Sequence, residues 1–128
     1  MLHKKTILVV DDDELLLKVT KELLQDEHTD VVTHRNAAGV TNRVNLLRPD
    51  LVLLDINMPS LSGETVALLL KSDEGARDVP IVFYSGNDED GLRDSAMAYG
   101  ARGYICKGNI VELRRKVACY LDSPERKC

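Results

Sequence analysis

The chain of 128 residues has the length of one ordinary domain, and its 44% apolar and 30% charged residues are typical of a folded globular protein. Its net charge of −4 disfavours direct binding to nucleic acid, because contacts with phosphates need a basic surface. No apolar run approaches the length of a membrane span, and the start MLHKKTILVVDDDE lacks the layout of a signal peptide. We therefore expect a cytoplasmic protein without a membrane partner.

Short apolar runs alternate along the chain with segments of helical spacing. We expect strands at Thr6–Val10, Asp30–Thr33, Leu51–Leu54, Ile81–Tyr84 and Gly103–Cys106. Three of these runs (ILVV, LVLL and IVFY) are continuously apolar, as is typical of parallel strands covered on both faces. The candidate N-caps of the five intervening helices are Asp13, Asn36, Ser62, Asp88 and Asn109. The alternation predicts an open, doubly wound parallel sheet with helices on both faces.

Polar residues that can carry chemistry follow four of the five expected strands. They are Asp11, Asp12, Asp13, Asp55, Ser85 and Lys107. Ligands bind beyond the carboxyl ends of parallel strands, so these side chains are expected at one rim of the sheet. Carboxylates about 4 Å apart repel by about 4 kcal/mol per pair at an effective dielectric near 20, so a cluster needs a cation. Oxygen ligands favour Mg²⁺, and with a lysine, a hydroxyl and a carboxylate nucleophile they indicate phosphoryl transfer.

The polar residues at the ends of the expected strands, in their order along the chain, resemble those of the receiver domain of bacterial two-component response regulators. The resemblance covers about residues 4–121 and rests on Asp11-Asp12, on Asp55 in LLDINMPSLSG, on Ser85 in FYSG and on Lys107 in GARGYICKG. It implies a flavodoxin-like α/β fold with five helices and the strand order 2-1-3-4-5, an order taken from the family and not from the pattern. It also implies a receiver domain at 1–122, followed by a polar tail or linker stub at 123–128.

The resemblance assigns the chemistry residue by residue. Asp55 would accept a phosphoryl group from a phosphohistidine on a sensor histidine kinase or a phosphotransfer protein. Asp11 and Asp12 would hold Mg²⁺, joined by Asp55 and the backbone carbonyl of Asn57. Lys107 would pair with the phosphoryl oxygens. The implied role is that of a signalling domain that assists its own phosphorylation and dephosphorylation, and not that of an enzyme.

The resemblance also implies how the signal would leave the site. Ser85 would move to bond the phosphoryl group, and Tyr104 would swing inward behind it as the switch aromatic. The face made by the fourth helix, the fifth strand and the fifth helix would then bind a downstream protein partner or an output domain. One departure is Gly108, where the family usually has a proline after a cis bond. A cis bond without proline costs ~3 kcal/mol, which favours a trans bond with glycine absorbing the turn.

Two alternatives remain open at this point. The acids after the first strand are also similar to those of haloacid-dehalogenase phosphatases, in which Asp11 would be the nucleophile and Asp13 the second aspartate. That alternative leaves the segment DINMP unexplained. The other alternative is a receiver that binds partners without being phosphorylated. Gly108 is the feature in its favour, whereas the acids and the lysine are all present.

Three cysteines, Cys106, Cys119 and Cys128, are widely spaced and include no C-x-x-C pair. They do not cluster with the histidines in the sequence, which disfavours a metal site built on sulfur. We therefore expect free thiols, two of them half-buried and one at a frayed terminus.

Overall fold

The structure, a computed structural model, describes residues 4–123, 125 and 128, so the expected domain start and part of the expected tail lie outside the described residues. The elements are β1 (Lys5–Val10), α1 (Glu14–Leu24), β2 (Thr29–His34), α2 (Val40–Leu47), β3 (Leu51–Leu54), α3 (Gly63–Ser72), β4 (Ile81–Ser85), α4 (Glu89–Tyr99), β5 (Gly103–Cys106) and α5 (Ile110–Asp122). The strands pair in parallel in the order β2-β1-β3-β4-β5, which confirms the flavodoxin-like sheet. Over the described part of the chain, no helix has both the length and the apolar character needed to cross a membrane.

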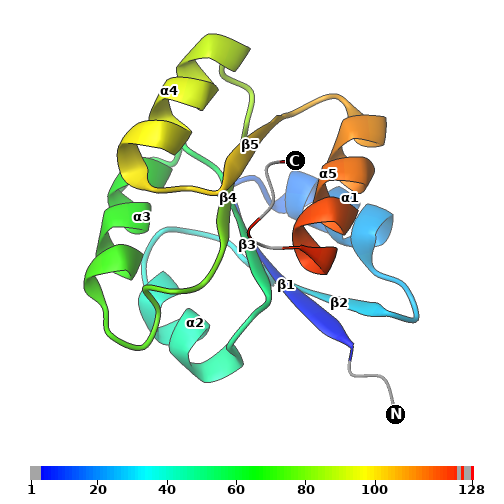
Figure 1. Cartoon of the computed structure of the whole chain (residues 1–128), viewed down its shortest axis with the longest axis horizontal. Helices are drawn as coiled ribbons and strands as arrows, with labels where there is room; N and C mark the ends of the chain where they lie inside the picture. Colours follow the sequence, from blue (N-terminus) through cyan, green and yellow to red (C-terminus); the bar gives the residue numbers. More distant parts are fainter. Residues whose placement is uncertain (1–3, 124, 126–127) are drawn as a thin grey trace.

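The helices form one layer on each face of the sheet, with α2, α3 and α4 on one side and α1 and α5 on the other (Figure 1). Successive strand side chains point to opposite faces, so a continuously apolar strand contributes to both layers. In β1, Leu8 and Val10 pack toward α2 and α3, whereas Ile7 and Val9 pack toward α1 and α5. The continuous apolar runs therefore reflect burial on both faces.

Local capping explains where most helices begin. At Asp13, Ser62 and Asn109 the side-chain oxygen accepts a hydrogen bond from the backbone amide three residues later, at 3.0–3.2 Å. These three expected N-caps are confirmed. Asp88 precedes α4 at the expected position, but its side chain makes no cap hydrogen bond. The caps matter for function because α1 and α3 are the elements that follow the strands at whose ends the candidate acids lie.

The expected cap of α2 is wrong. The Asn36 side chain accepts a hydrogen bond from the amide of Ala38 at 3.0 Å, which closes a local turn. The helix begins later, at Val40, after Gly39 in the left-handed region with φ of 78°. An asparagine that can cap a helix can also close such a turn, and the residues after it decide between the two.

The expectation of free thiols at Cys119 and Cys128 is also wrong, because the two residues form a disulfide with a Cα–Cα distance of 6.1 Å. Cys119 lies in the last turn of α5, and Cys128 lies beside it. The nine-residue separation belongs to no local motif, so sequence spacing did not reveal the pair. Cys106 is a half-buried free cysteine, as expected.

Candidate functional site

Three carboxylates meet at the carboxyl ends of β1 and β3. These strands are neighbours in register, with Val10 opposite Leu54, so the residues that follow them, Asp11 and Asp55, lie at the same edge. Carboxylate oxygens of Asp11, Asp12 and Asp55 all lie within 4.8 Å of one another. Asp11 and Asp55 are 2% and 4% exposed, whereas Asp12 is exposed. The rim therefore holds two buried acids with a third at the surface.

Each buried acid is oriented by the turn that follows it. One oxygen of Asp11 accepts a hydrogen bond from the amide of Asp13 at 3.0 Å, and one oxygen of Asp55 accepts from the amide of Asn57 at 3.3 Å. These are turns closed by the aspartate side chain, so each carboxylate has one partner within two positions of it in the sequence. The acid-rich segment thus orients Asp11 while its third aspartate, Asp13, caps α1.

Lys107 joins the two buried acids. Its Nζ lies 2.8 Å from Oδ2 of Asp11 and 3.5 Å from Oδ1 of Asp55. The backbone amide of Lys107 donates to the carbonyl of Ser85 at 2.9 Å, which places the lysine at the end of β5. None of the described peptide bonds is cis, and Gly108 has φ of 97°. The trans bond and the turn at glycine that the sequence favoured are both present.

The electrostatics of the cluster leave it short of positive charge. Burial raises the pKa of Asp55 above its usual value; the charge of Lys107 opposes this, and the charge of Asp11 adds to it. Burial alone would lower the pKa of Lys107, but its hydrogen bond with Asp11 and the charges of both acids outweigh this and raise it. One lysine thus pairs with two acids of a cluster of three. A site of oxygen donors with excess negative charge fits a hard divalent cation such as Mg²⁺.

Ser85 is fully buried at the end of β4, and its hydroxyl accepts a hydrogen bond from the side-chain amide of Asn57 at 3.1 Å. The same amide donates to the side-chain oxygen of Asn87 at 2.7 Å. Asn57 therefore links the loops after β3 and β4 through its side chain. Sequence reasoning considered only its backbone carbonyl and did not consider Asn87. Asparagine is common in turns, so no sequence signal marked Asn57 and Asn87 as residues that join two loops.

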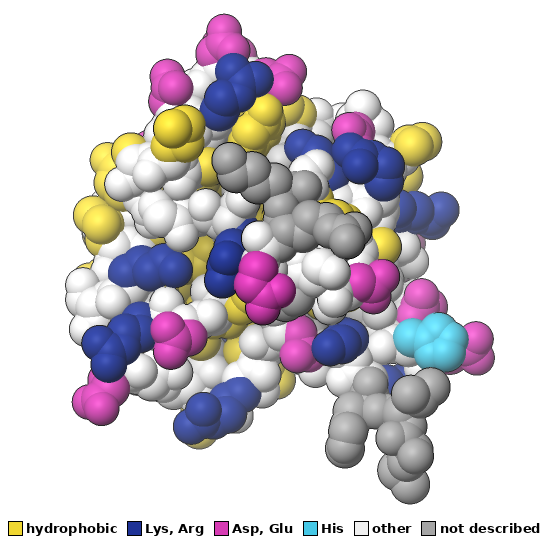
Figure 2. Space-filling view, viewed as in Figure 1, with side chains coloured by type: hydrophobic (Ala, Val, Ile, Leu, Met, Phe, Trp, Pro, Cys, Tyr) yellow, Lys and Arg dark blue, Asp and Glu magenta, His cyan; other side chains and the backbone are white. Residues whose placement is uncertain are grey.

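Tyr104 lies away from the acids, on the surface formed by α4, β5 and α5. Its hydroxyl donates to Glu89 at 3.0 Å, and a guanidinium nitrogen of Arg93 donates to that hydroxyl at 3.4 Å. Lys116 lies 4.6 Å from the ring centroid and donates to the backbone carbonyl of Tyr104 at 3.0 Å. Two charged residues of α4 and one of α5 thus hold the ring in an outward position. Figure 2 shows acidic and basic side chains beside each other over α4.

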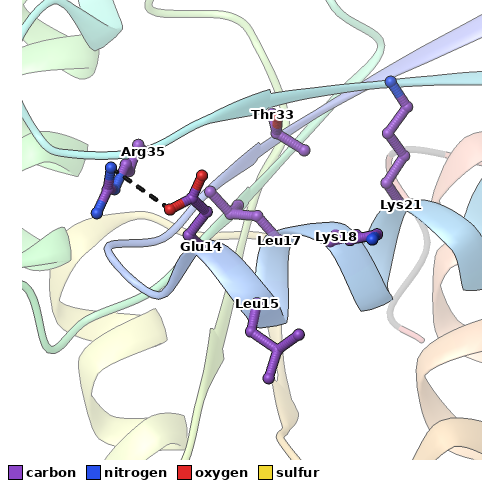
Figure 3. Close-up of a pocket in the computed structure, with 7 residues that line it drawn as sticks. All are labelled: Glu14, Leu15, Leu17, Lys18, Lys21, Thr33 and Arg35. Atoms are coloured by element: carbon purple, nitrogen blue, oxygen red, sulfur yellow. Dashed lines mark ion pairs between the residues drawn. The ribbon is translucent and has the colours of Figure 1, made fainter.

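A hollow between α1 and β2 shares no lining residue with the acid cluster (Figure 3). Its lining includes Glu14, which pairs with Arg35 at 3.6 Å, and two lysines of α1, Lys18 and Lys21. Figure 3 shows Leu15 pointing away from β2, where it is 71% exposed. The lining residues include no carboxylate cluster and no nucleophile paired with a base. The acid cluster is therefore the better candidate for the functional site.

Gly63 is required where α3 starts against the backbone of Asp55. A Cβ at this position would collide with the carbonyl oxygen of Asp55 and lie 2.9 Å from Cα of Ile56. We expect Gly63→Ala to lower the free energy of unfolding by about 1–3 kcal/mol, the usual cost of overpacking, because backbone must move. Urea unfolding measures this loss. Gly86→Ala is the matched control, since a Cβ there meets nothing within 4 Å, and equal losses in the two variants would contradict the explanation.

Together, the parallel sheet, the acidic rim and the lysine define an α/β protein with a cluster of three acids and a lysine at the carboxyl ends of its strands. The chain belongs to the family of response regulator receiver domains, whose model matches residues 7–118. The resemblance found in the sequence is thereby confirmed. Receiver domains are signalling domains of two-component systems that interact with histidine kinases and downstream partners and bind Mg²⁺ at an acidic pocket.

Named relatives and solved structures agree with this assignment. The polar-differentiation response regulator DivK of Brucella anthropi is 31% identical over 107 residues, which cover 80% of this chain and 84% of that protein. The BeF3-activated receiver domain of Klebsiella pneumoniae RstA matches with a TM-score of 0.82 and 27% identity, covering 91% of this chain and 98% of that one. Vibrio cholerae chemotaxis protein CheY4 matches with a TM-score of 0.82, 21% identity and the same coverage, which shows the fold alone.

Proposed function

We propose that this receiver accepts a phosphoryl group on Asp55, in an Mg²⁺-dependent reaction, from a phosphohistidine of a sensor histidine kinase or a phosphotransfer protein. The observation that carries the proposal is the position of Lys107, whose Nζ lies within 3.5 Å of both buried acids. We place the protein in the cytoplasm, with residues 1–122 as the receiver and 123–128 as a polar tail or linker stub. The domain would act as a signalling switch and not as an enzyme with its own substrate.

Asp11, Asp12 and Asp55, with the backbone carbonyl of Asn57, are the residues that would hold Mg²⁺. Their oxygens suit a hard cation, and their combined charge exceeds that of the neighbouring lysine. When bound, Mg²⁺ neutralises negative charge on the acids and on the incoming phosphoryl group. The buried Asp11 would also keep Lys107 protonated and at the rim, because the pKa of that lysine is raised.

In the transfer step, a carboxylate oxygen of Asp55 attacks phosphorus while the phosphorus–nitrogen bond of the phosphohistidine breaks. The electron pair of that bond leaves with the imidazole, and Asp55 becomes an acyl phosphate. The added group brings negative charge and acceptor oxygens next to Lys107. The hydroxyl of Ser85 accepts a hydrogen bond from the side-chain amide of Asn57 at 3.1 Å. Ser85 would then give up this hydrogen bond and donate one to a phosphoryl oxygen. Tyr104 would leave Glu89 and move inward behind Ser85.

The direct test is incubation of the purified protein with acetyl phosphate and Mg²⁺, followed by intact mass spectrometry. We expect a gain of one phosphoryl group that chelation of Mg²⁺ prevents. Absence of labelling under these conditions would contradict the proposal and favour the receiver that binds partners without phosphorylation. Labelling mapped to Asp11 would instead favour the phosphatase alternative.

Mg²⁺ itself is expected to stabilise the protein. At ten times its dissociation constant, a ligand that binds the folded state alone raises the free energy of unfolding by about 1.4 kcal/mol. We expect Asp12→Asn to remove most of this gain in thermal or urea unfolding. Asp13→Asn should keep the gain, because asparagine caps α1 as well as aspartate does and the side chain of Asp13 is engaged with the amide of Leu16. Equal losses in the two variants would argue against Asp12 as a ligand.

A further inference from the structure

The disulfide between Cys119 and Cys128 is not used by the phosphorylation chemistry, yet it lies at the surface that carries Tyr104. A groove between α4, β5 and α5 is lined by residues that include Arg93, Met97, Tyr104, Lys116, Tyr120 and Cys128. The chain end, marked C in Figure 1, lies beside β5. The hydroxyl of Tyr120 is in hydrogen-bonding contact with the backbone of Cys128. The disulfide therefore fastens Cys128 in the groove that the outward ring of Tyr104 helps to form.

The location of the pair suggests that it is reversible. Both cysteines are half-buried, so a small thiol can reach their sulfur atoms. Disulfides are rare in the cytoplasm, where we place this protein, and those that occur there are mostly redox-sensing or catalytic. The bond links residues nine positions apart at the end of the chain, and Cys128 packs against the edge of the core on the α1 and α5 side of the sheet.

We propose that Cys119 and Cys128 form a reversible thiol–disulfide site whose oxidised form holds Cys128 in the groove and stabilises the outward position of Tyr104. The inference rests on the proposed function in two respects, namely the cytoplasmic location and the inward movement of Tyr104 when Asp55 is phosphorylated. The outward ring and Cys128 line the same groove, so the inward movement of Tyr104 changes the shape of the groove in which Cys128 lies. Oxidation thus opposes the active state, and by reciprocity the active state eases reduction.

The redox step is a two-electron exchange. A thiolate of a reducing dithiol attacks one sulfur of the Cys119–Cys128 bond and forms a mixed disulfide, while the other sulfur leaves as a thiolate. The second thiol of the reductant then displaces the first cysteine, so the reductant leaves as a disulfide and both cysteines gain a proton. Oxidation is the reverse reaction with a disulfide reagent as the oxidant.

The test uses the full chain labelled with 3-fluorotyrosine, with the fluorine signals of Tyr104 and Tyr120 assigned by replacement with phenylalanine. We expect both signals to shift when dithiothreitol reduces the protein and to return when oxidised dithiothreitol is added. Alkylation of thiols, read by mass spectrometry, should modify one cysteine before reduction and three after it. Cys106→Ser should keep the fluorine response, and Cys128→Ser should give the spectrum of the reduced protein at all times. Unchanged Tyr104 and Tyr120 signals on reduction would overturn the proposal.

A second arm connects the site to phosphorylation, with beryllofluoride and Mg²⁺ as the analogue of the phosphoryl group. We expect the oxidised protein to bind the analogue about fivefold more weakly than the reduced protein, within the usual range of coupling between two sites. Equal affinities would overturn the coupling. If the analogue shifts no signal in either redox form, the proposed movement of Tyr104 fails and the coupling fails with it, whereas acetyl phosphate labelling decides separately whether Asp55 is the acceptor. The response to reduction alone still decides whether the disulfide holds the groove.

Discussion

Replacing Asp55 by asparagine is expected to abolish the incorporation of a phosphoryl group from acetyl phosphate. The amide has nearly the same shape as the carboxylate but is not a nucleophile, so the loss should reach the detection limit of intact mass spectrometry. The geometry around it should persist, because the side-chain oxygen can still accept from the amide of Asn57. Labelling that survives in Asp55→Asn at full extent would mean that another residue is the acceptor.

Asp11→Asn is the matched control for this experiment. It removes a charge from the same buried cluster and weakens both cation binding and the position of Lys107. We expect slower labelling that is recovered in part at higher Mg²⁺, with the phosphoryl group still on Asp55. If Asp11→Asn lost all labelling even at higher Mg²⁺ while Asp55→Asn kept it, Asp11 would be the acceptor. That result would support the phosphatase alternative.

The same Asp55→Asn substitution should stabilise the metal-free protein, by about 0.5–2 kcal/mol as other stabilising substitutions do. The pKa of Asp55 is raised by burial and by the charge of Asp11, so its ionised form is disfavoured in the folded state. At neutral pH, the disfavoured charge of Asp55 lowers the free energy of unfolding of the wild type, whereas the asparagine of the variant carries no charge. As the pH falls through the raised pKa of Asp55, the folded wild type gains a proton and the difference begins to shrink, and it is gone once the pH is below the ordinary pKa of an aspartate in the unfolded chain. Urea unfolding in a chelating buffer at several pH values measures the trend.

Replacing Lys107 by methionine is expected to have the largest effect on stability, a loss of about 3 kcal/mol in the metal-free protein. The substitution leaves two nearly buried carboxylates, Asp11 and Asp55, without their cation, and removing one partner of a buried ion pair is costly. Mg²⁺ should restore part of the loss, because it supplies the missing charge. Unfolding by urea with Mg²⁺ and with a chelator measures both quantities.

Two further variants show whether the loss comes from the unpaired acids. Lys116→Met makes the same change at a lysine whose Nζ donates to a backbone carbonyl at the surface, and we expect a loss below about 1 kcal/mol. Adding Asp11→Asn to Lys107→Met should recover stability, since the two residues are in contact and their effects are not additive. If the double variant is as unstable as the sum of the single ones, the electrostatic explanation is wrong.

Much of this site was predictable from short stretches of sequence. Asp11 and Asp55 directly follow continuous apolar runs, and such runs form buried strands whose ends the sheet brings to one edge. The cap at Asp13 depends on residues within three positions, so it was also predictable. The strand order came from the family resemblance, because apolar periodicity carries no information about which strands are neighbours.

The tertiary structure alone decided the contacts between distant residues. Lys107 reaches Asp11 across 96 positions, and the side chain of Asn57 reaches Ser85 across 28. The pairing of Cys119 with Cys128 likewise depends on how the chain returns after α5. The sequence by itself determined which residues end the strands, because burial and capping are local preferences. The packed sheet determined which of those residues touch, because hydrogen bonds and ion pairs depend on distances that no local pattern encodes.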